Sequence, residues 1–232
     1  YFYDLPSGIL LWQSFLRGQV RALRFYKNET KLLAGSGDGH LYQIDAATGN
    51  QDWRADVETW PFQHIGVSSD EKRIVVGGKA DPATIMSDRG EILWKAYVDG
   101  AVHWSDLFSD YSVMIDGQYY DAKGNKKWVI GGLGMGSGII FQDKYAIAGG
   151  DGVVVVDKQG RILWKWDSIR ESPDKIQRYT RFVKPTSDGK YIIAAGAKVG
   201  DCLTGFVAIF EGRFGPAKAE SIQLQPLPSQ PL

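Results

Sequence analysis

A glycine followed four residues later by a tryptophan occurs five times along the chain, and this repeat constrains the fold more than any other feature. The five steps run from Gly8 to Trp12, Gly49 to Trp53, Gly90 to Trp94, Gly124 to Trp128 and Gly160 to Trp164. Successive tryptophans are separated by 41, 41, 34 and 36 residues. A recurring period of this size predicts an array of similar supersecondary units. We expect the repeated tryptophans to pack between neighbouring units, because an indole is large and apolar.

One period contains four short apolar stretches separated by turn residues. In the period that carries Trp53, the segments 31–39, 40–49 and 50–57 follow an upstream stretch that begins near Gln19. Gly39 and Gly49 suit the tight turns between them, because glycine adopts positive φ at little cost. Four strands per period predict an all-β fold, a β-propeller of four-stranded antiparallel blades, with about five blades in this chain.

We expect a single propeller domain over residues 1–215, followed by a Pro-rich tail over 216–232. The predicted blades lie near 19–57, 60–98, 100–130, 131–166 and 180–212, with 1–12 as closing strands. The segment 1–12 reads as a third and fourth strand, and the last blade lacks its own Gly-to-Trp step. Two interpretations stay open: a small closed ring with an irregular seam, or a segment of a longer propeller.

The pattern D-x-x-x-G-x-x-x-W resembles the tryptophan-docking motif of the quinoprotein-type, or PQQ-like, propeller repeat family. The segment LYQIDAATGNQDW, residues 41–53, is the best match. Members of this family include quinone-dependent dehydrogenases and many non-enzymatic propellers, among them an outer-membrane assembly lipoprotein and surface proteins of prokaryotes. Because many members are exported, the resemblance implies an extracytoplasmic location in a prokaryote, in the periplasm or at the cell surface.

Several departures from the quinone-binding members indicate the non-quinone branch. Those members are more than twice as long, and they carry a vicinal cysteine pair and a calcium site made of Glu, Asn and Asp. This chain has a single cysteine, Cys202, and no acidic cluster that matches the calcium ligands. We therefore predict no cofactor and no metal. The family's usual alanine two residues before the aspartate is also replaced, by Phe2, Gln43, Tyr119 and Val155.

The charge balance and hydropathy argue against two classes of partner. Lys plus Arg and Asp plus Glu both number 27, so no basic field is present to attract nucleic acid. No apolar run approaches the roughly 20 residues that a membrane-spanning helix needs. We expect neither nucleic-acid binding nor direct membrane insertion.

Candidates for catalysis are few. His64 and His103 both fall in predicted first strands, which line the central channel of a propeller, and Asp106 follows closely. If these side chains converge, they make an acid/base site, and the alternative function is a small hydrolase or lyase. Unconnected polar residues at a channel mouth are the simpler interpretation, because a site needs converging geometry that spacing alone does not supply.

The favoured function is a non-catalytic scaffold that binds a protein or glycan through loops on one face. Rigid blades with variable loops suit this role, and we predict that the chain is not an enzyme. The candidate contact residues, where exposed, are the aromatic residues outside the repeated position: Trp60, Trp104, Tyr119, Tyr120 and Trp166. Loops around 59–63 and 166–180 form the predicted face. A further option is a subunit of an envelope assembly that pairs in trans through an open blade edge.

Overall fold

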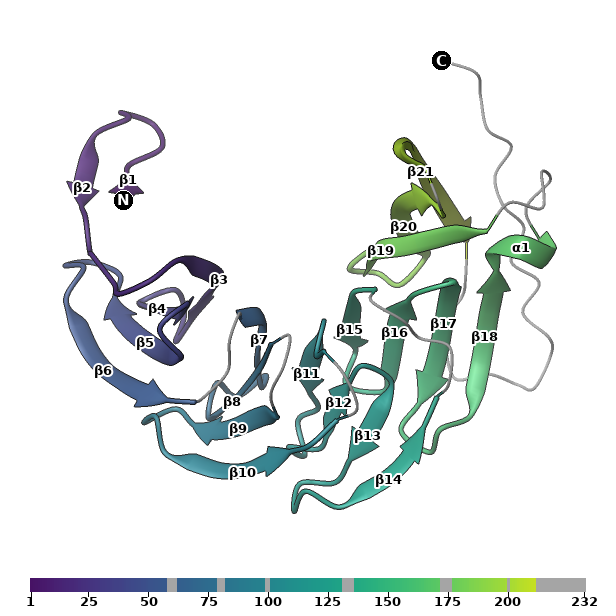
Figure 1. Cartoon of the computed structure of the whole chain (residues 1–232), viewed down its shortest axis with the longest axis horizontal. Helices are drawn as coiled ribbons and strands as arrows, with labels where there is room; N and C mark the ends of the chain where they lie inside the picture. The colour runs from purple at the N-terminus through teal and green to yellow at the C-terminus, as the bar shows by residue number, and fades with distance from the viewer. Residues whose placement is uncertain are drawn as a thin grey trace. The chain divides into compact units, whose positions relative to one another are not determined.

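The computed structural model shows an all-β chain (Figure 1). The structure describes residues 1–57, 62–78, 82–98, 101–130, 136–171, 177–199 and 201–211, without the side chains of Gln63 and of residues 201–204. The chain divides into two compact units, Tyr1–Ile115 with Tyr120–Asn125 and Asp116–Tyr119 with Lys126–Leu232. The Pro-rich segment 216–232 lies outside the described residues.

Four sheets have four strands each, and in every one the strands pair in chain order. The first comprises β3 (Val20–Tyr26), β4 (Lys31–Ser36), β5 (His40–Asp45) and β6 (Gln51–Asp56). The second comprises β7 (Phe62–Val67), β8 (Arg73–Gly78), β9 (Ala83–Ser87) and β10 (Ile92–Ala96). The third comprises β11 (Ser105–Leu107), β12 (Val113–Ile115), β13 (Gln118–Tyr120) and β14 (Lys126–Val129). The fourth comprises β15 (Gly138–Phe141), β16 (Tyr145–Gly149), β17 (Gly152–Asp157) and β18 (Ile162–Asp167).

Two further sheets are smaller. β1 (Phe2–Tyr3) pairs with β2 (Leu10–Trp12), and β19 (Arg178–Pro185), β20 (Tyr191–Lys198) and β21 (Asp201–Glu211) form a three-stranded sheet. The short helix α1 (Ser168–Glu171) follows β18. These sheets confirm the predicted β-propeller architecture of about five blades, with each blade an antiparallel meander. No helix in the described part of the chain is long and apolar enough to cross a membrane.

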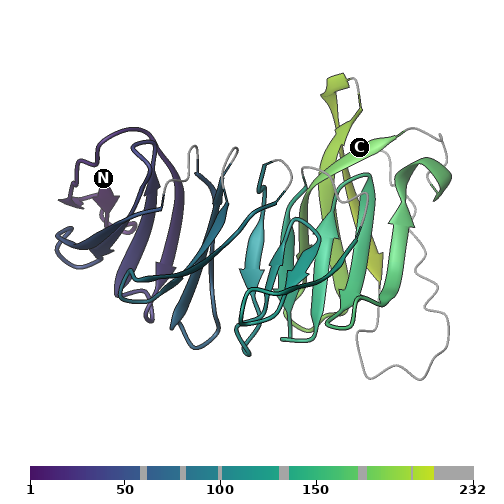
Figure 2. The same cartoon turned by 60° about the horizontal axis from the view of Figure 1, so that its bottom comes forward.

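Inner strands of the second and fourth sheets are apolar on both faces because these sheets are covered on two sides. All the residues of β9 and β17 are buried, and so is β8 after its first residue. Figure 2 shows the sheets β3–β6 and β7–β10 side by side, and β7 packs on both β3 and β4. Strands of this kind appear as continuous apolar runs in the sequence, without a polar face.

Four of the repeated tryptophans lie against the motif glycine of the following sheet. These pairs are Trp12 with Gly49, Trp53 with Gly90, Trp94 with Gly124, and Trp128 with Gly160. A methyl group added at each glycine would lie 2.7, 3.0, 3.1 and 3.0 Å from the indole, respectively. All four glycines have positive φ, so both backbone conformation and space require glycine here. Gly8 also has positive φ, but an added methyl group there would meet no atom within 4 Å.

At two of these junctions the indole nitrogen also helps to fix the ring over the glycine. Trp12 Nε1 donates to the carbonyl oxygen of Ala46 at 2.8 Å, and Trp128 Nε1 donates to that of Lys158 at 3.1 Å. Each acceptor directly follows the motif aspartate of the next sheet. At these two junctions the N–H bond and the ring packing together hold the outer strand on the turn of its neighbour.

The residue two before the motif aspartate is the cross-strand neighbour of the tryptophan. The register pairs Phe2 with Trp12 and Gln43 with Trp53. The rings of Phe2 and Trp12 stack with centroids 4.9 Å apart, and Tyr119 stacks on Trp128 at 4.9 Å. Where the family carries alanine, this chain therefore places larger side chains beneath two of the indoles, which adds stacking to the docking contact.

A β-bulge precedes each tryptophan whose register is defined. In β10, for example, Ile92 pairs with Met86 and Trp94 with Ile85, which leaves Leu93 unpaired. The other bulged residues are Leu11, Asp52 and Leu163. An extra residue at this point turns the outer strand and re-aims the tryptophan toward the next sheet. Bulges on outer strands also discourage edge-to-edge pairing.

The motif aspartate closes the turn before the glycine. Asp157 Oδ1 accepts from the backbone N–H groups of Gln159 and Arg161 at 3.0 and 2.9 Å. In the second sheet Ser87 occupies the position of the motif aspartate, and its Oγ accepts hydrogen bonds from the N–H groups of Arg89 and Glu91. Short polar side chains of either kind can hold such a turn. The motif is thus more variable than the pattern D-x-x-x-G-x-x-x-W.

Candidate functional site

His64 lies on β7 and faces the next first strand, β11. Its Nδ1 accepts a hydrogen bond from the backbone N–H of Ser105 at 3.4 Å. Loss of solvation, together with the nearby Arg24 guanidinium, lowers the pKa of His64 from 6.5 to about 4. His64 is therefore a neutral hydrogen-bond acceptor at pH 7, and its poor proton affinity makes it a weak general base.

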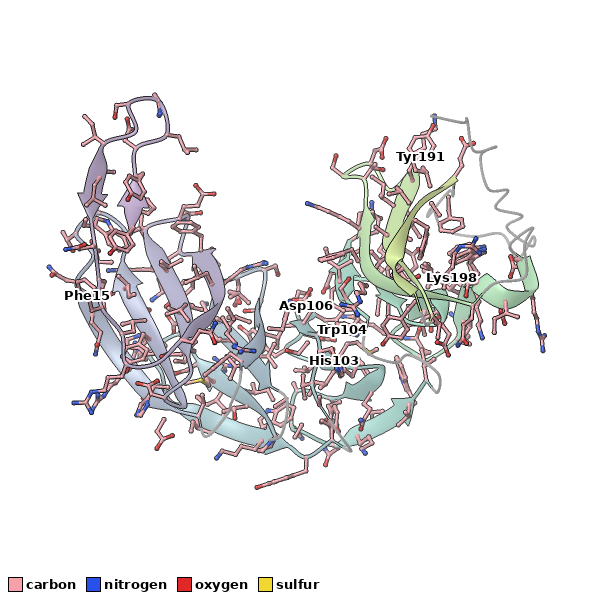
Figure 3. All side chains as sticks on the ribbon, turned by 45° about the horizontal axis from the view of Figure 1, so that its top comes forward. Phe15, His103, Trp104, Asp106, Tyr191 and Lys198 are labelled. Carbon is pink, nitrogen blue, oxygen red and sulfur yellow. The ribbon has the colours of Figure 1, made fainter. Side chains whose placement is uncertain are left out.

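His103 and Asp106 flank Trp104 at the start of β11 (Figure 3). Asp106 Oδ1 accepts from the N–H of Leu107 at 3.0 Å, a local bond within the strand. The structure thus brings His64 to β11 through a hydrogen bond from the backbone N–H of Ser105. Among the described residues, no group of three or more His, Cys, Asp or Glu side chains could hold a metal ion.

The depressed pKa of His64 predicts a pH dependence of stability. Because the unfolded imidazole takes up a proton near pH 6.5 and the folded one only near pH 4, protonation favours the unfolded chain. The contribution is complete above pH 6.5 and is lost as the pH falls toward 4. We expect His64→Gln to reduce the loss of unfolding free energy between pH 7 and pH 4 by roughly 2 to 3 kcal/mol. Urea titrations of both proteins at the two pH values measure this difference, and parallel pH profiles would contradict it.

Three of the aromatic contact candidates are core residues. Trp104 is 1% exposed, and Tyr120 and Trp166 are also buried. Trp166 packs on Phe206 and Phe210, and Tyr120 lies near Trp94. Their assignment as binding residues is corrected, because a buried ring has no surface to offer a partner.

The other two aromatic contact candidates are Tyr119 and Trp60. Tyr119 is half-buried and its ring stacks on Trp128, so it acts with the docking tryptophan. Trp60 lies outside the described residues, as does part of the predicted loop face, at 58–61 and 172–176. Of the segment 166–180, the structure shows α1 and the start of β19.

An exposed apolar face on the sheet β19–β21 was not predicted from the sequence. Phe182 and Val207 are 70% and 72% exposed, and Ile193 and Ile209 are exposed as well. The register places Phe182 opposite Ala195 and Ala195 opposite Val207, and Ile193 pairs with Ile209. These side chains therefore form two adjoining cross-strand rows on one face.

The opposite face of the same sheet is core. Val183, Ile192 and Phe210 are buried in a cluster with Ile147 and Val155 of the fourth sheet. The signal that could have revealed the exposed face is the unbroken apolar run in β20, YIIAA, which has no polar side. Such a strand is suited to coverage on both faces. Figure 3 labels Tyr191 and Lys198 at the two ends of this strand.

The fold and the docking motif together define a PQQ-like propeller. A family model described as "Outer membrane protein assembly factor BamB" matches residues 1–197, and the chain belongs to this family. A curated relative with the same description, from Burkholderia pseudomallei (strain K96243), is 30% identical over 144 residues. That match covers 55% of this chain and 37% of the relative, so the matched region spans little more than a third of the relative's length.

Solved structures share the fold. The β-propeller domain of Cps50 (Swd1) from Myceliophteria thermophila has a TM-score of 0.72 at 11% identity, covering 92% of this chain and 73% of that one. Hydrazine synthase from Kuenenia stuttgartiensis has a TM-score of 0.65 at 17% identity, covering 93% and 70%. At these identities the likeness concerns the propeller architecture and not the activity.

Proposed function

We propose that the chain is a non-catalytic, protein-binding scaffold of the bacterial cell envelope that serves the assembly of outer membrane proteins. Membership of the BamB family supports this role. Extracytoplasmic location is part of the same proposal, because the matched relative is named for outer membrane protein assembly.

The observation that carries the proposal is the exposed apolar face of β19–β21. Contiguous exposed apolar side chains on a folded domain mark surfaces that associate with other proteins. Burying one Phe or Val side chain contributes about 1.5 to 3 kcal/mol, so Phe182 and Val207 could anchor a partner. A protein partner suits this face better than a glycan, because aliphatic side chains offer few hydrogen bonds to sugar hydroxyls.

A hydrolase or lyase is not our second candidate. His64 Nδ1 accepts a hydrogen bond from the backbone N–H of Ser105, and the low pKa of His64 disfavours proton uptake at neutral pH. No specific observation favours a reaction at this position.

The test places a charge on the proposed contact face in the organism that encodes the chain. We expect Val207→Asp to lower the fraction of folded outer-membrane β-barrel proteins as a gene deletion does, because a carboxylate in an apolar interface is costly to desolvate. Val129→Asp is the matched control, since Val129 is also exposed on a strand. The readout is the folded fraction seen by heat-modifiable electrophoretic mobility. Equal effects of the two variants would contradict the assigned face.

A further inference from the structure

The outer hairpin of the third sheet, β13–β14, is shorter than the outer hairpin of the first sheet. β13 and β14 have three and four residues, whereas β5 and β6 have six each. In the first sheet the last hydrogen bond of this hairpin is donated by the N–H of Val57, four residues after Trp53. In the third sheet the equivalent bond is donated by the N–H of Ile130, only two residues after Trp128. The shortening is therefore at the end of the hairpin that lies farther from the docking turn.

The full-length hairpin shows what the short one leaves uncovered. In the second sheet Thr84 lies under Val57, and its Oγ1 donates to the carbonyl oxygen of Val57 at 3.5 Å. The register pairs Thr84 with Lys95 and, at the equivalent place in the fourth sheet, Val154 with Lys165. Lys95 is half-buried, whereas Lys165 is exposed. The short hairpin thus covers less of the fourth sheet than its counterpart covers of the second.

A pocket of about 190 Å³ lies at this uncovered place, and all its lining residues belong to the second unit. The aliphatic part of the lining comes from the short hairpin, the fourth sheet and α1: Ile130, Val154, Ile162 and Ile169. Ile162 and Ile169 are 53% and 43% exposed. The pocket is smaller than the roughly 300 Å³ at which small-molecule sites begin, so it suits one long side chain.

The charged part of the lining consists of two carboxylates and one ammonium: Asp151, Asp167 and Lys165. Asp151 Oδ1 accepts from Gln177 Nε2 at 3.2 Å. Asp167 Oδ1 accepts from the N–H groups of Ile169 and Arg170, both at 3.1 Å. Asp167 Oδ2 lies 3.8 Å from Nε of Arg170, which is longer than a hydrogen bond. Because a carboxylate offers about four lone-pair sites, both aspartates have capacity for a further donor.

An arginine side chain matches both parts of this lining. Its aliphatic stem packs on apolar surface while the guanidinium stays at the polar rim. The guanidinium also carries five N–H donors in a planar arrangement that suits carboxylate oxygens. A carboxylate guest would meet two negative charges, and a purely apolar guest would leave them without a partner. Lys165 is exposed, so its ammonium can turn to water while its own stem lines the pocket.

We propose that this pocket receives an arginine side chain of a partner protein, with the stem against Ile130 and Ile162 and the guanidinium on Asp151 and Asp167. The lining residues lie between positions 130 and 169, well inside the chain, and none of them is an arginine. The proposal goes beyond the proposed function, because it needs neither the apolar face of β19–β21 nor a role in outer membrane assembly. It defines a second contact with its own chemistry.

The test is an NMR titration of the full chain labelled at its isoleucine methyl groups. The probe is N-acetyl-arginine amide, and the matched control is N-acetyl-citrulline amide, which has the same shape without the charge. We expect the probe to shift the methyl signals of Ile130, Ile162 and Ile169 and to leave those of Ile193 and Ile209 unchanged. Citrulline should bind at least about tenfold more weakly, because it makes no charge-assisted hydrogen bonds to the carboxylates.

Three variants test the charges of the pocket. Asp151→Asn keeps an acceptor for Gln177, and Asp167→Asn keeps a residue suited to the start of α1, so both should stay folded. Each should weaken arginine binding about tenfold and hardly change citrulline binding, a difference that a merely structural role would not produce. Lys165→Gln should strengthen arginine binding by up to about threefold, because it removes a like charge.

One further variant separates a partner from the chain itself. Arg213 is the only arginine outside the described residues. Arg213→Gln should leave probe binding unchanged, whereas tighter binding in this variant would show that the chain's own arginine occupies the pocket and would overturn the assignment to a partner. Val207→Asp should also leave probe binding unchanged, which separates this pocket from the face of β19–β21. Equal binding of probe and control, or no methyl shift with either, would overturn the proposal.

Discussion

Replacing Gly49 with valine is expected to lower the free energy of unfolding by about 4 kcal/mol. Gly49 has φ of +74°, which costs a β-branched residue about 1 to 3 kcal/mol. The added Cβ would lie 2.7 Å from the Trp12 ring, and overpacking of this kind costs about 1 to 3 kcal/mol more. Urea denaturation followed by circular dichroism measures the loss.

Gly8→Val is the control for the backbone part of this effect. Gly8 holds the same place in the repeat and has φ of +67°, but no atom lies within 4 Å of an added methyl group. It should therefore lose only the contribution of the strained backbone. If both variants lose the same stability, the tryptophan does not require the glycine, and our account of the junction is wrong.

Trp104→Ala is expected to cost about 3 to 5 kcal/mol of stability, as truncation of a large buried aromatic residue does. Trp104 is 1% exposed and lies in the first unit, directly before β11. Differential scanning calorimetry and urea titration measure the loss. The result separates a core residue from the surface contact that the sequence had suggested.

The exposed aromatic residue Tyr97 provides the comparison for Trp104. Tyr97 is 77% exposed, and Tyr97→Ala should change the unfolding free energy by no more than about 0.5 kcal/mol. A small effect of Trp104→Ala, close to that of Tyr97→Ala, would show that the ring is not packed as the structure has it.

The repeat made the fold predictable. A glycine and a tryptophan four residues apart place an outer strand, a turn and a docking contact in one pattern, and the structure has Trp53 over Gly90 as that pattern requires. Local chemistry was sufficient for this, because the turn and the strand after it are adjacent in the chain. Ser87 shows the limit, since a hydroxyl replaces the expected carboxylate in the same turn.

Burial was harder to predict than strand position. Trp104 and Trp166 lie outside the repeat and were candidate contacts, yet both are core residues. In a blade covered on two faces, an aromatic residue can be buried on either face, so alternation gives no sign of exposure. For the same reason the exposed face of β19–β21 could not be predicted, because its strands show no alternation and its residues resemble core residues in the sequence.

The histidine hypothesis depended on side-chain partners, which the spacing of residues does not supply. Spacing of one repeat placed His64 and His103 on neighbouring first strands, but it gave no information about side-chain partners. In the structure His64 accepts a hydrogen bond from a backbone N–H and lies near Arg24. A positive neighbour is unfavourable for an imidazole that must take up a proton. Geometry of this kind depends on the packing of two sheets and cannot be obtained from one sequence.

The most direct measurement for the scaffold function is the folded fraction of outer-membrane β-barrel proteins in cells that lack the gene. We predict a clear decrease, restored by the wild-type gene and by the Val129→Asp variant but not by Val207→Asp. A deletion strain whose β-barrel proteins fold as in the parent would contradict the proposed role in outer membrane protein assembly.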